Sequence, residues 1–241
     1  MSCMANAGFV KRFQISDMVA RIIPFAGFMV FIGLEEGLRF LRSHELLSFS
    51  EQSLFLLYPV KTVVAAILLF WLYRRFSELH WRDLGRLPDT LLSLLLGLVV
   101  FILWINMDWN LGTLSEGAGF NPEMVADSGL RKILVFFRLV GPVLLVPLME
   151  ELFWRSFILR YLVDNDFMKI RIGHFTWFSC LASAVLFGLE HHLIFAGIMA
   201  GLAYNLLLYR TKSIAQCVFA HAVTNLALGI YVLLSGRWMF W

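Results

Sequence analysis

Three short segments of this sequence place ionisable or amide side chains inside long apolar runs. They lie at residues 150–155, 187–191 and 221–225. Moving a charged side chain into hydrocarbon costs about 2.5–3.5 kcal/mol even on permissive insertion scales, so such residues usually have a function. Together the segments supply glutamate, histidine and asparagine, which can act as a base, a second proton-handling group and a donor to a developing oxyanion. This set suits the attack of an activated water on a carbonyl group.

The first segment reads Glu-Glu-x-x-x-Arg. Glu151 and Arg155 are four residues apart with the acid first, which is the favourable order for an ion pair on a helix. Such a pair would neutralise both groups inside a membrane. Glu150 lies about 100° further round the helix, free to face a cavity and to take a proton from water. The alternative is that all three residues form one structural ion-pair cluster that locks helices together.

The second and third segments read Phe-x-x-x-His and His-x-x-x-Asn. Phe187 and His191 are four residues apart, as are His221 and Asn225, so each pair shares one helix face. His221 and Asn225 could direct two donors into one cavity. The alternative for each is an ordinary hydrogen bond between helices. We prefer that alternative for Glu190, His192 and Asn205. Glu190 and His192 are expected near the outer interface or at a tight turn.

The composition indicates the setting of these residues. Hydrophobic residues make up 60% of the 241 and charged residues 15%, whereas a soluble domain has about 45–50% and about 25%. Apolar runs of about 20 residues recur, and only helices or closed barrels can span a bilayer. We therefore expect an all-α polytopic membrane protein with about seven to eight transmembrane helices enclosing an intramembrane polar cavity. The net charge of +3 gives no reason to expect nucleic-acid binding.

The apolar runs predict seven spans and one irregular loop, at about 108–130, which is rich in Gly, Asn and Pro. The predicted spans are 18–34, 53–73, 89–107, 133–159, 175–191, 193–209 and 214–235. The helix that carries His191 is expected to begin in the cytoplasm and to continue past that residue. Residues 1–130 would supply N-terminal transmembrane helices and residues 131–241 the catalytic core of one integral membrane domain.

The distribution of basic residues predicts the orientation. One set of loops holds Lys11, Arg12, Arg74, Arg75, Arg82, Arg86, Arg160, Lys169, Arg171, Arg210 and Lys212, and the other set holds only Arg39, Arg42, Arg131, Lys132 and Arg237. The richer set is expected in the cytoplasm. The chain would then be a multi-pass protein of the plasma (inner) membrane, with its N-terminus cytoplasmic, its C-terminus outside and no cleaved signal peptide. The outer side would carry an acidic loop with Asp108, Glu116, Glu123 and Asp127.

The three motifs, in this order and on successive predicted spans, resemble those of the CAAX-protease and bacteriocin-processing family of intramembrane glutamic endopeptidases. The type II CAAX prenyl endopeptidases belong to that family. The resemblance covers roughly residues 130–235. It implies that Glu150 activates water with the help of His191, and that His221 and Asn225 form the oxyanion hole. Glu151 and Arg155 match the structural part of the first motif.

This resemblance implies hydrolysis of a peptide bond without a covalent intermediate and without a cofactor. The substrate would be a membrane-associated or lipid-anchored protein or peptide, which need not be prenylated. Hydrophobic access from the lipid bilayer would suit such a substrate.

Three other functions stay open at this point. Glu150, His191 and His221 could be three zinc ligands of a metalloendopeptidase-like enzyme, although no His-Glu-x-x-His motif is present. Buried Glu and His could relay protons in a proton-coupled transporter. The chain could also be a catalytically inactive scaffold or a self-immunity membrane protein built on the protease fold.

Overall fold

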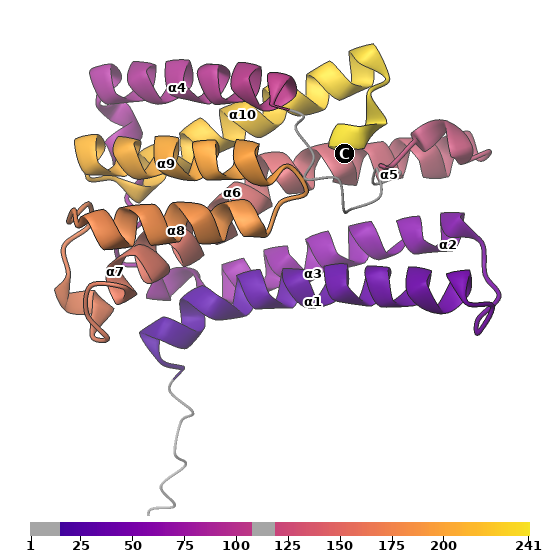
Figure 1. Cartoon of the computed structure of the whole chain (residues 1–241), viewed down its shortest axis with the longest axis horizontal. Coiled ribbons are helices and arrows are strands. Elements are labelled where there is room, and N and C mark those ends of the chain that lie inside the picture. The colour runs from indigo at the N-terminus through magenta and orange to yellow at the C-terminus, as the bar shows by residue number, and fades with distance from the viewer. Residues whose placement is uncertain (1–14, 108–118) are drawn as a thin grey trace, which may run out of the picture.

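The computed structural model describes residues 15–107 and 119–241, and over these residues the chain is helical with no strand. The α-helices are α1 (Asp17–Ser43), α2 (Glu51–Phe55), α3 (Leu57–Leu72), α4 (Leu87–Asn106), α5 (Ser128–Val140), α6 (Val146–Glu151), α7 (Leu159–Tyr161), α8 (Trp177–Leu189), α9 (Ile194–Thr211) and α10 (Ile214–Ser235). Figure 1 shows the longer helices side by side along the long axis of the molecule. The expected all-α fold is confirmed over the described residues.

Among the described residues, six helical stretches are long and apolar enough to cross a membrane. They are Asp17–Ser43, Gln52–Arg75, Leu87–Asn106, Ser128–Tyr161, Ile194–Thr211 and Ile214–Ser235. α8 is also apolar but has only 13 residues, which is about 20 Å of helix. The chain is therefore a multi-pass membrane protein. Of the seven predicted spans, the one at 175–191 is shorter than expected and falls below the length of a typical span.

The expectation that this helix continues past His191 is wrong, because α8 ends at Leu189. In a continuing helix the backbone N–H of residue 191 would bond the carbonyl of Phe187. Instead that carbonyl accepts a hydrogen bond from His191 Nδ1, at 2.7 Å. The backbone N–H of His191 bonds the carbonyl of Gly188 at 3.1 Å, which is the tighter 3₁₀ pattern. The link 190–193 then reverses the chain into α9, partway along the bundle (Figure 1).

Glycines allow α8 and α9 to pack closely on either side of this link. A Cβ atom on Gly188 would lie 2.4 Å from the Ile198 side chain and 2.8 Å from the Ile194 carbonyl oxygen. A Cβ atom on Gly197 would lie 2.8 Å from the Gly188 Cα. Such approaches are possible only for glycine, the residue that membrane helices use at close crossings. The close packing holds His191 in the interior.

α10 lies against α4 at another glycine. A Cβ atom on Gly97 would lie 2.5 Å from the carbonyl oxygen of Ala220. The Thr224 hydroxyl lies 2.8 Å from the carbonyl oxygen of Gly97, and the Tyr204 hydroxyl donates to Thr224 Oγ1 at 2.8 Å. These bonds connect α4, α9 and α10. Because His221 follows Ala220 directly, they also fix the depth of His221.

Helices α5, α6 and α7 form one helical stretch, Ser128–Tyr161. Two π-helical segments, Gly141–Leu145 and Leu152–Ile158, interrupt it. π-helical turns inside α-helices occur frequently at functional sites. Glu150 and Glu151 lie on the short α6 between them.

Charged connections collect at the two ends of the bundle. At the left-hand end of Figure 1 lie the start of α1, the α3–α4 connection, the α7–α8 connection and the α9–α10 turn. These segments carry most of the basic residues predicted to be cytoplasmic. Lys11, Arg12, Asp108 and Glu116 lie outside the described residues. The assignment of this end to the cytoplasm stays a prediction.

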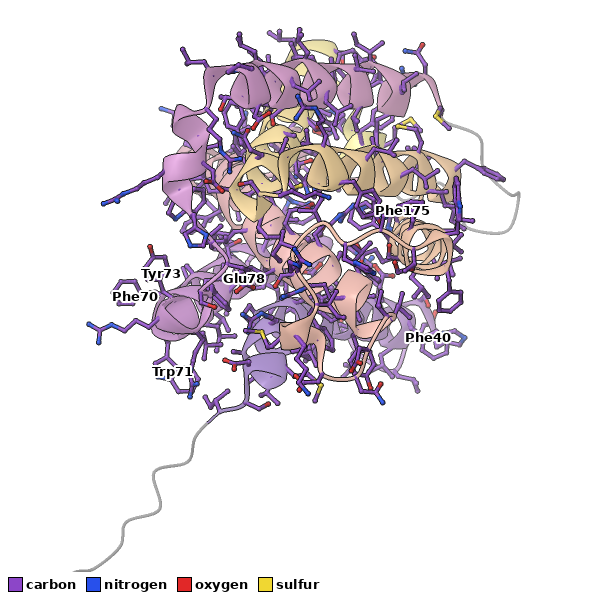
Figure 2. All side chains as sticks on the ribbon, turned by 90° about the vertical axis from the view of Figure 1, so that its left-hand side faces the viewer. Phe40, Phe70, Trp71, Tyr73, Glu78 and Phe175 are labelled. Atoms are coloured by element: carbon purple, nitrogen blue, oxygen red, sulfur yellow. The ribbon has the colours of Figure 1, made fainter. Side chains whose placement is uncertain are left out.

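A buried ionic cluster joins three segments at this end, which faces the viewer in Figure 2. The fully buried Arg21 donates to both carboxylate oxygens of Glu78, at 2.8 and 2.6 Å. The Ser156 hydroxyl also donates to Glu78, and Arg160 Nη2 lies 4.0 Å from it. Burial alone would raise the pKa of Glu78, but the hydrogen bonds and charge of Arg21, with the Ser156 hydroxyl, outweigh it and hold that pKa below its usual value.

We expect Glu78→Gln to destabilise the protein by about 3 kcal/mol, because it leaves the charge of Arg21 buried without its carboxylate partner. Since the pKa of Glu78 is lowered on folding, its contribution is complete above the ordinary pKa of about 4.3. It is lost as the pH falls from there through the folded-state pKa. Unfolding in detergent, monitored by circular dichroism at several pH values, measures both effects. The exposed Glu36→Gln is the control and should cost less than about 1 kcal/mol; equal costs would contradict the prediction.

We expect Gly188→Ala to push α8 and α9 apart and to lower stability by about 1–3 kcal/mol, as overpacking does. Gly33→Ala is the matched control, because a Cβ atom there meets nothing within 4 Å. That variant should be neutral or slightly stabilising, since alanine is the better helix former. Thermal unfolding of both purified variants tests the pair, and a neutral Gly188→Ala would show that the close helix contact is not required.

Candidate active site

Polar side chains from three places along the chain line one cavity of about 190 Å³. Glu150 comes from α6, His191 from the α8–α9 link, and His221 and Asn225 from α10. All four residues predicted to be catalytic therefore reach the same space. Their roles in catalysis remain predictions, because a shared cavity shows that the four side chains are near one another and does not show what each one does.

Glu151 and Arg155 lie behind the cavity and are almost completely buried. Arg155 Nε lies 3.2 Å from Glu151 Oε2, and Arg155 Nη2 donates to the carbonyl of Gly201 on α9 at 3.3 Å. The guanidinium group also lies over the rings of Phe187 and Tyr204, 4.4 and 5.3 Å from their centroids. Such cation–π contacts are strongest where water is excluded. The Arg155 charge thus has partners on α6, α8 and α9.

Glu151 has a second contact that the motif analysis did not anticipate. Its Oε1 lies 3.0 Å from His221 Nδ1, and the imidazole stacks on the Tyr204 ring with centroids 5.0 Å apart. A carboxylate paired with arginine can only accept a hydrogen bond, so we assign the Nδ1 proton of His221 to this contact. The other ring nitrogen, Nε2, then lies on the side of Glu150, 3.9 Å from its Oε2.

The ring of His191 is oriented in the same manner. Its Nδ1 lies 2.7 Å from the carbonyl oxygen of Phe187, which can only accept, so Nδ1 carries the proton and Nε2 keeps a lone pair. The ring also makes edge contacts with Trp104 and lies against Phe187. In their neutral forms both histidines of the cavity therefore have an accepting Nε2.

Glu150 is the polar group of this site with the fewest partners. It is 8% exposed, and its Oε2 has no hydrogen-bond partner among the described residues. A separation of 3.9 Å from His221 Nε2 is too long for a direct hydrogen bond, but a water molecule can bridge such a gap. A buried carboxylate beside a polar cavity is well placed to hold a water.

Asn225 is already engaged with the backbone of the long helix. Its Nδ2 donates to the carbonyl of Pro142 at 2.7 Å. In the π-helical segment the N–H of Val146 bonds the carbonyl of Gly141, five residues back. The next carbonyl, that of Pro142, would need the N–H of residue 147, which is a proline and has none. Asn225 therefore replaces a missing helix bond, and its second amide hydrogen remains for another acceptor.

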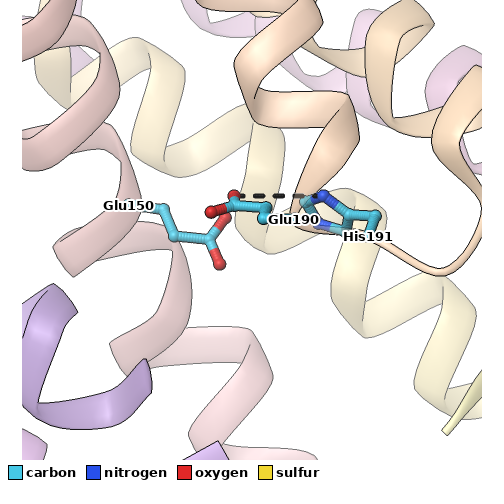
Figure 3. Close-up of side chains that lie close together, drawn as sticks. All are labelled: Glu150, Glu190 and His191. Carbon is cyan, nitrogen blue, oxygen red and sulfur yellow. Dashed lines mark ion pairs between the residues drawn. The ribbon is translucent and has the colours of Figure 1, made fainter. Parts of the chain in front are cut away.

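Glu190 is the residue that sequence reasoning missed. It lies in a tight turn, as expected, and its side chain is half-buried beside Glu150 (Figure 3). Its Oε1 accepts a hydrogen bond from Trp154 Nε1 at 3.0 Å, and its Oε2 has no partner among the described residues. The sequence feature that could have identified it is a glutamate next to His191 within an apolar stretch. Placing that carboxylate there costs free energy for the same reason as at Glu150.

The geometry brings together a set of possible metal ligands that differs from the expected one. Among the residues that the structure describes, the His, Cys, Asp and Glu side chains close enough to share one ion are Glu150, Glu190 and His191, with ligand atoms within 4.8 Å of one another. His221, the third member of the expected set, is not part of this group, although its Nε2 lies 3.9 Å from Glu150 Oε2. The three residues of that zinc hypothesis therefore do not form one ligand group. The prediction that no cofactor is needed stays a prediction.

The region that carries the site matches a known protein family. Residues 132–227 match the family described as type II CAAX prenyl endopeptidase Rce1-like. No curated protein and no solved structure matches the chain. The matched region begins just after the start of α5 and ends within α10, so it includes the whole set from Glu150 to Asn225. Over residues 132–227, this chain is therefore similar to the type II CAAX prenyl endopeptidase Rce1-like family, in agreement with the resemblance of its three motifs.

Proposed function

We propose that this protein is an intramembrane endopeptidase of the glutamic type. The observation that carries the proposal is the position of Glu150, whose buried and unpartnered carboxylate oxygen faces a cavity that His191, His221 and Asn225 also line. The family match supports a CAAX-type endopeptidase in general. The roles of Glu150, His191, His221 and Asn225 are those that the motif resemblance implies, and their shared cavity is compatible with them.

In the first step a water held between Glu150 and His191 attacks the carbonyl carbon of the substrate. Glu150 accepts one proton of that water, and the accepting Nε2 of His191 orients the other hydrogen. A carbon–oxygen bond forms, and the carbonyl π electrons move to its oxygen. In the second step the oxyanion collapses, the carbon–nitrogen bond breaks, and Glu150 gives its proton to the leaving amine.

The oxyanion needs donors where its charge develops. Asn225 can offer the amide hydrogen that Pro142 does not use. His221 can donate from Nε2 only as an imidazolium, after that nitrogen has taken up a proton, because its Nδ1 proton is held by Glu151. The proton that Glu150 accepts from the water can supply it through a water bridging the 3.9 Å to Nε2, and it returns to Glu150 as the oxyanion collapses. The carboxylate of Glu151 favours that charged form when the oxyanion appears, so it assists His221 as well as pairing with Arg155.

The substrate that fits this site is the polypeptide end of a membrane-associated or lipid-anchored protein. The site lies within a bundle of apolar helices, and the cavity wall includes Trp104, Phe187 and Phe240. The family is described by its action on prenylated proteins, and a prenyl chain is one lipid anchor that would bring a substrate to this depth. We propose a location in the plasma membrane with the N-terminus in the cytoplasm, and the distribution of basic residues supports this orientation.

We expect Glu150→Gln to lower the rate of hydrolysis at least about 100-fold, because the general base is lost. The unfolding midpoint should not fall, since glutamine keeps the shape and removes a buried charge. Reporter peptides with and without a C-terminal prenylated cysteine, added to proteoliposomes, provide the assay. Glu36→Gln should cleave at the wild-type rate. Full activity in Glu150→Gln would rule out this mechanism.

We expect Arg155→Ala to reduce stability by about 3–5 kcal/mol, because it leaves Glu151 as an unpaired charge in the interior. The control is Arg82→Ala, at an exposed position in the α3–α4 connection, which should be neutral. Adding Glu151→Gln to Arg155→Ala should recover part of the loss. Thermal unfolding of the three purified variants measures this, and an unchanged Arg155→Ala protein would contradict a structural role for the pair.

A further inference from the structure

We propose that Glu190 is a positioning residue that shares a single proton with Glu150, so that the two carboxyl groups together carry one negative charge. The proton sharing itself is a property of the folded protein and can be tested without a substrate. Its role in hydrolysis rests on the proposed function.

The two carboxyl groups lie next to each other in the interior. Each offers an oxygen within 4.8 Å of the other, and Figure 3 shows the Glu190 carboxyl directed toward that of Glu150. The Oε2 atoms of both residues are buried and have no partner among the described residues. A buried polar atom without a partner is costly. A proton held between the two groups satisfies one oxygen of each.

Within the described parts of the chain, the charges around the pair leave no cation to neutralise it. Three ionisable groups lie on the same helical stretch as Glu150: Glu151, Arg155 and, about 18 Å away along the helix, Arg138. The others lie on neighbouring segments: Glu190 and His191 on the α8–α9 link, Tyr204 on α9 and His221 on α10. Arg155 is paired with Glu151. Each imidazole has its Nδ1 engaged elsewhere, that of His191 with the Phe187 carbonyl and that of His221 with Glu151.

Two ionised carboxylates at this separation in an interior of low dielectric repel each other strongly. In proteins such a pair usually keeps one proton, so that the pair as a whole loses its two protons in two steps at well-separated pH values. One Glu190 oxygen already accepts from Trp154. A proton on the pair satisfies the two carboxylate oxygens that have no partner among the described residues.

Trp154 sets the orientation of Glu190. The indole N–H donates to Oε1 at 3.0 Å, and this leaves Oε2 as the oxygen available to Glu150. Trp154 lies on the same long helix as Glu150, four residues later, so one helix holds both the base and the group that aligns its partner. Glu190 does not line the cavity, which is why it positions the base without touching the substrate.

During hydrolysis the pair would begin and end with one proton. It takes a second proton from the attacking water as the carbon–oxygen bond forms, and it gives one proton to the amine nitrogen as the carbon–nitrogen bond breaks. Hydrogen bonding from the protonated Glu190 would keep Glu150 ionised and aimed at the water in a site that otherwise disfavours charge.

Infrared spectroscopy of the purified full-length protein tests this directly, because a protonated carboxyl group has a carbonyl stretch distinct from that of a carboxylate. At neutral pH the wild type should show the band of one protonated carboxyl group. Glu190→Gln and Glu150→Gln should each abolish it, since the remaining carboxyl group is then free to ionise. Glu36→Gln, at an exposed ion pair, should leave it unchanged.

Two results would overturn the proposal. A band that survives in Glu190→Gln and disappears in Glu150→Gln would mean that burial alone protonates Glu150. A wild-type spectrum without the band would mean that both groups are ionised and that another positive charge neutralises them. Circular dichroism and the unfolding midpoint verify that each isosteric variant is folded.

A second readout applies once a peptide is cleaved by the wild type. Glu190→Gln should move the acidic limb of the kcat/KM profile about one pH unit to higher pH, because the protonated carboxyl group that favours the ionised form of Glu150 is replaced by a weaker hydrogen-bond donor. A merely structural change would lower the rate without moving the limb. The expected infrared pattern in a protein that cleaves no peptide would refute the proposed function and still support the shared proton, so the two failures are distinguishable.

Discussion

The structure depends on neutralising Arg155 in the centre of an apolar bundle. A buried guanidinium is tolerated only when its charge is compensated and its N–H groups are directed to acceptors or ring faces. Glu151 provides the charge, the carbonyl of Gly201 accepts a hydrogen bond, and two aromatic rings lie under the cation. Since Glu151 also bonds His221, the same arrangement connects the long helix with α8, α9 and α10. The pair is both the main electrostatic link between these helices and the support of one candidate catalytic residue.

The second requirement is close approach of the backbones. Gly97 and Gly188 each lie where a Cβ atom would overlap the neighbouring helix. Membrane helices gain little from the hydrophobic effect once they are in lipid, so close packing and hydrogen bonds between helices must hold them together. Each close contact here lies within three residues of a polar group of the site, His221 in one case and His191 in the other. The close packing of the helices therefore also fixes the positions of these site residues.

A third feature is the irregular course of the long helix. Pro147 cannot donate a backbone hydrogen bond, and the π-helical turn before it leaves the Pro142 carbonyl for Asn225. The interhelical hydrogen bond that was the alternative for Asn225 is therefore present, yet the residue still faces the cavity. A structural bond from one amide hydrogen and a catalytic role for the other are compatible.

The sequence alone determined the class of protein and most of the site. The apolar runs required a helical membrane protein, because backbone polar groups must be satisfied within lipid. The cost of burying charge was enough to single out Glu150, Glu151, Arg155, His191 and His221. The four-residue spacings were enough to pair Glu151 with Arg155. They were also enough to associate the three motifs with a protease family.

Only the tertiary structure decided what surrounds these residues. The end of α8 at Leu189 depends on a side chain that replaces a backbone hydrogen bond, and no periodicity in the sequence shows that competition. The same folding brings Glu190 from the α8–α9 link to Glu150, 40 positions earlier in the chain. Contacts between distant segments depend on how helices cross, which local spacing does not determine. The sequence therefore supplied the ionisable groups, and the packing of the helices decided which of them share a charge.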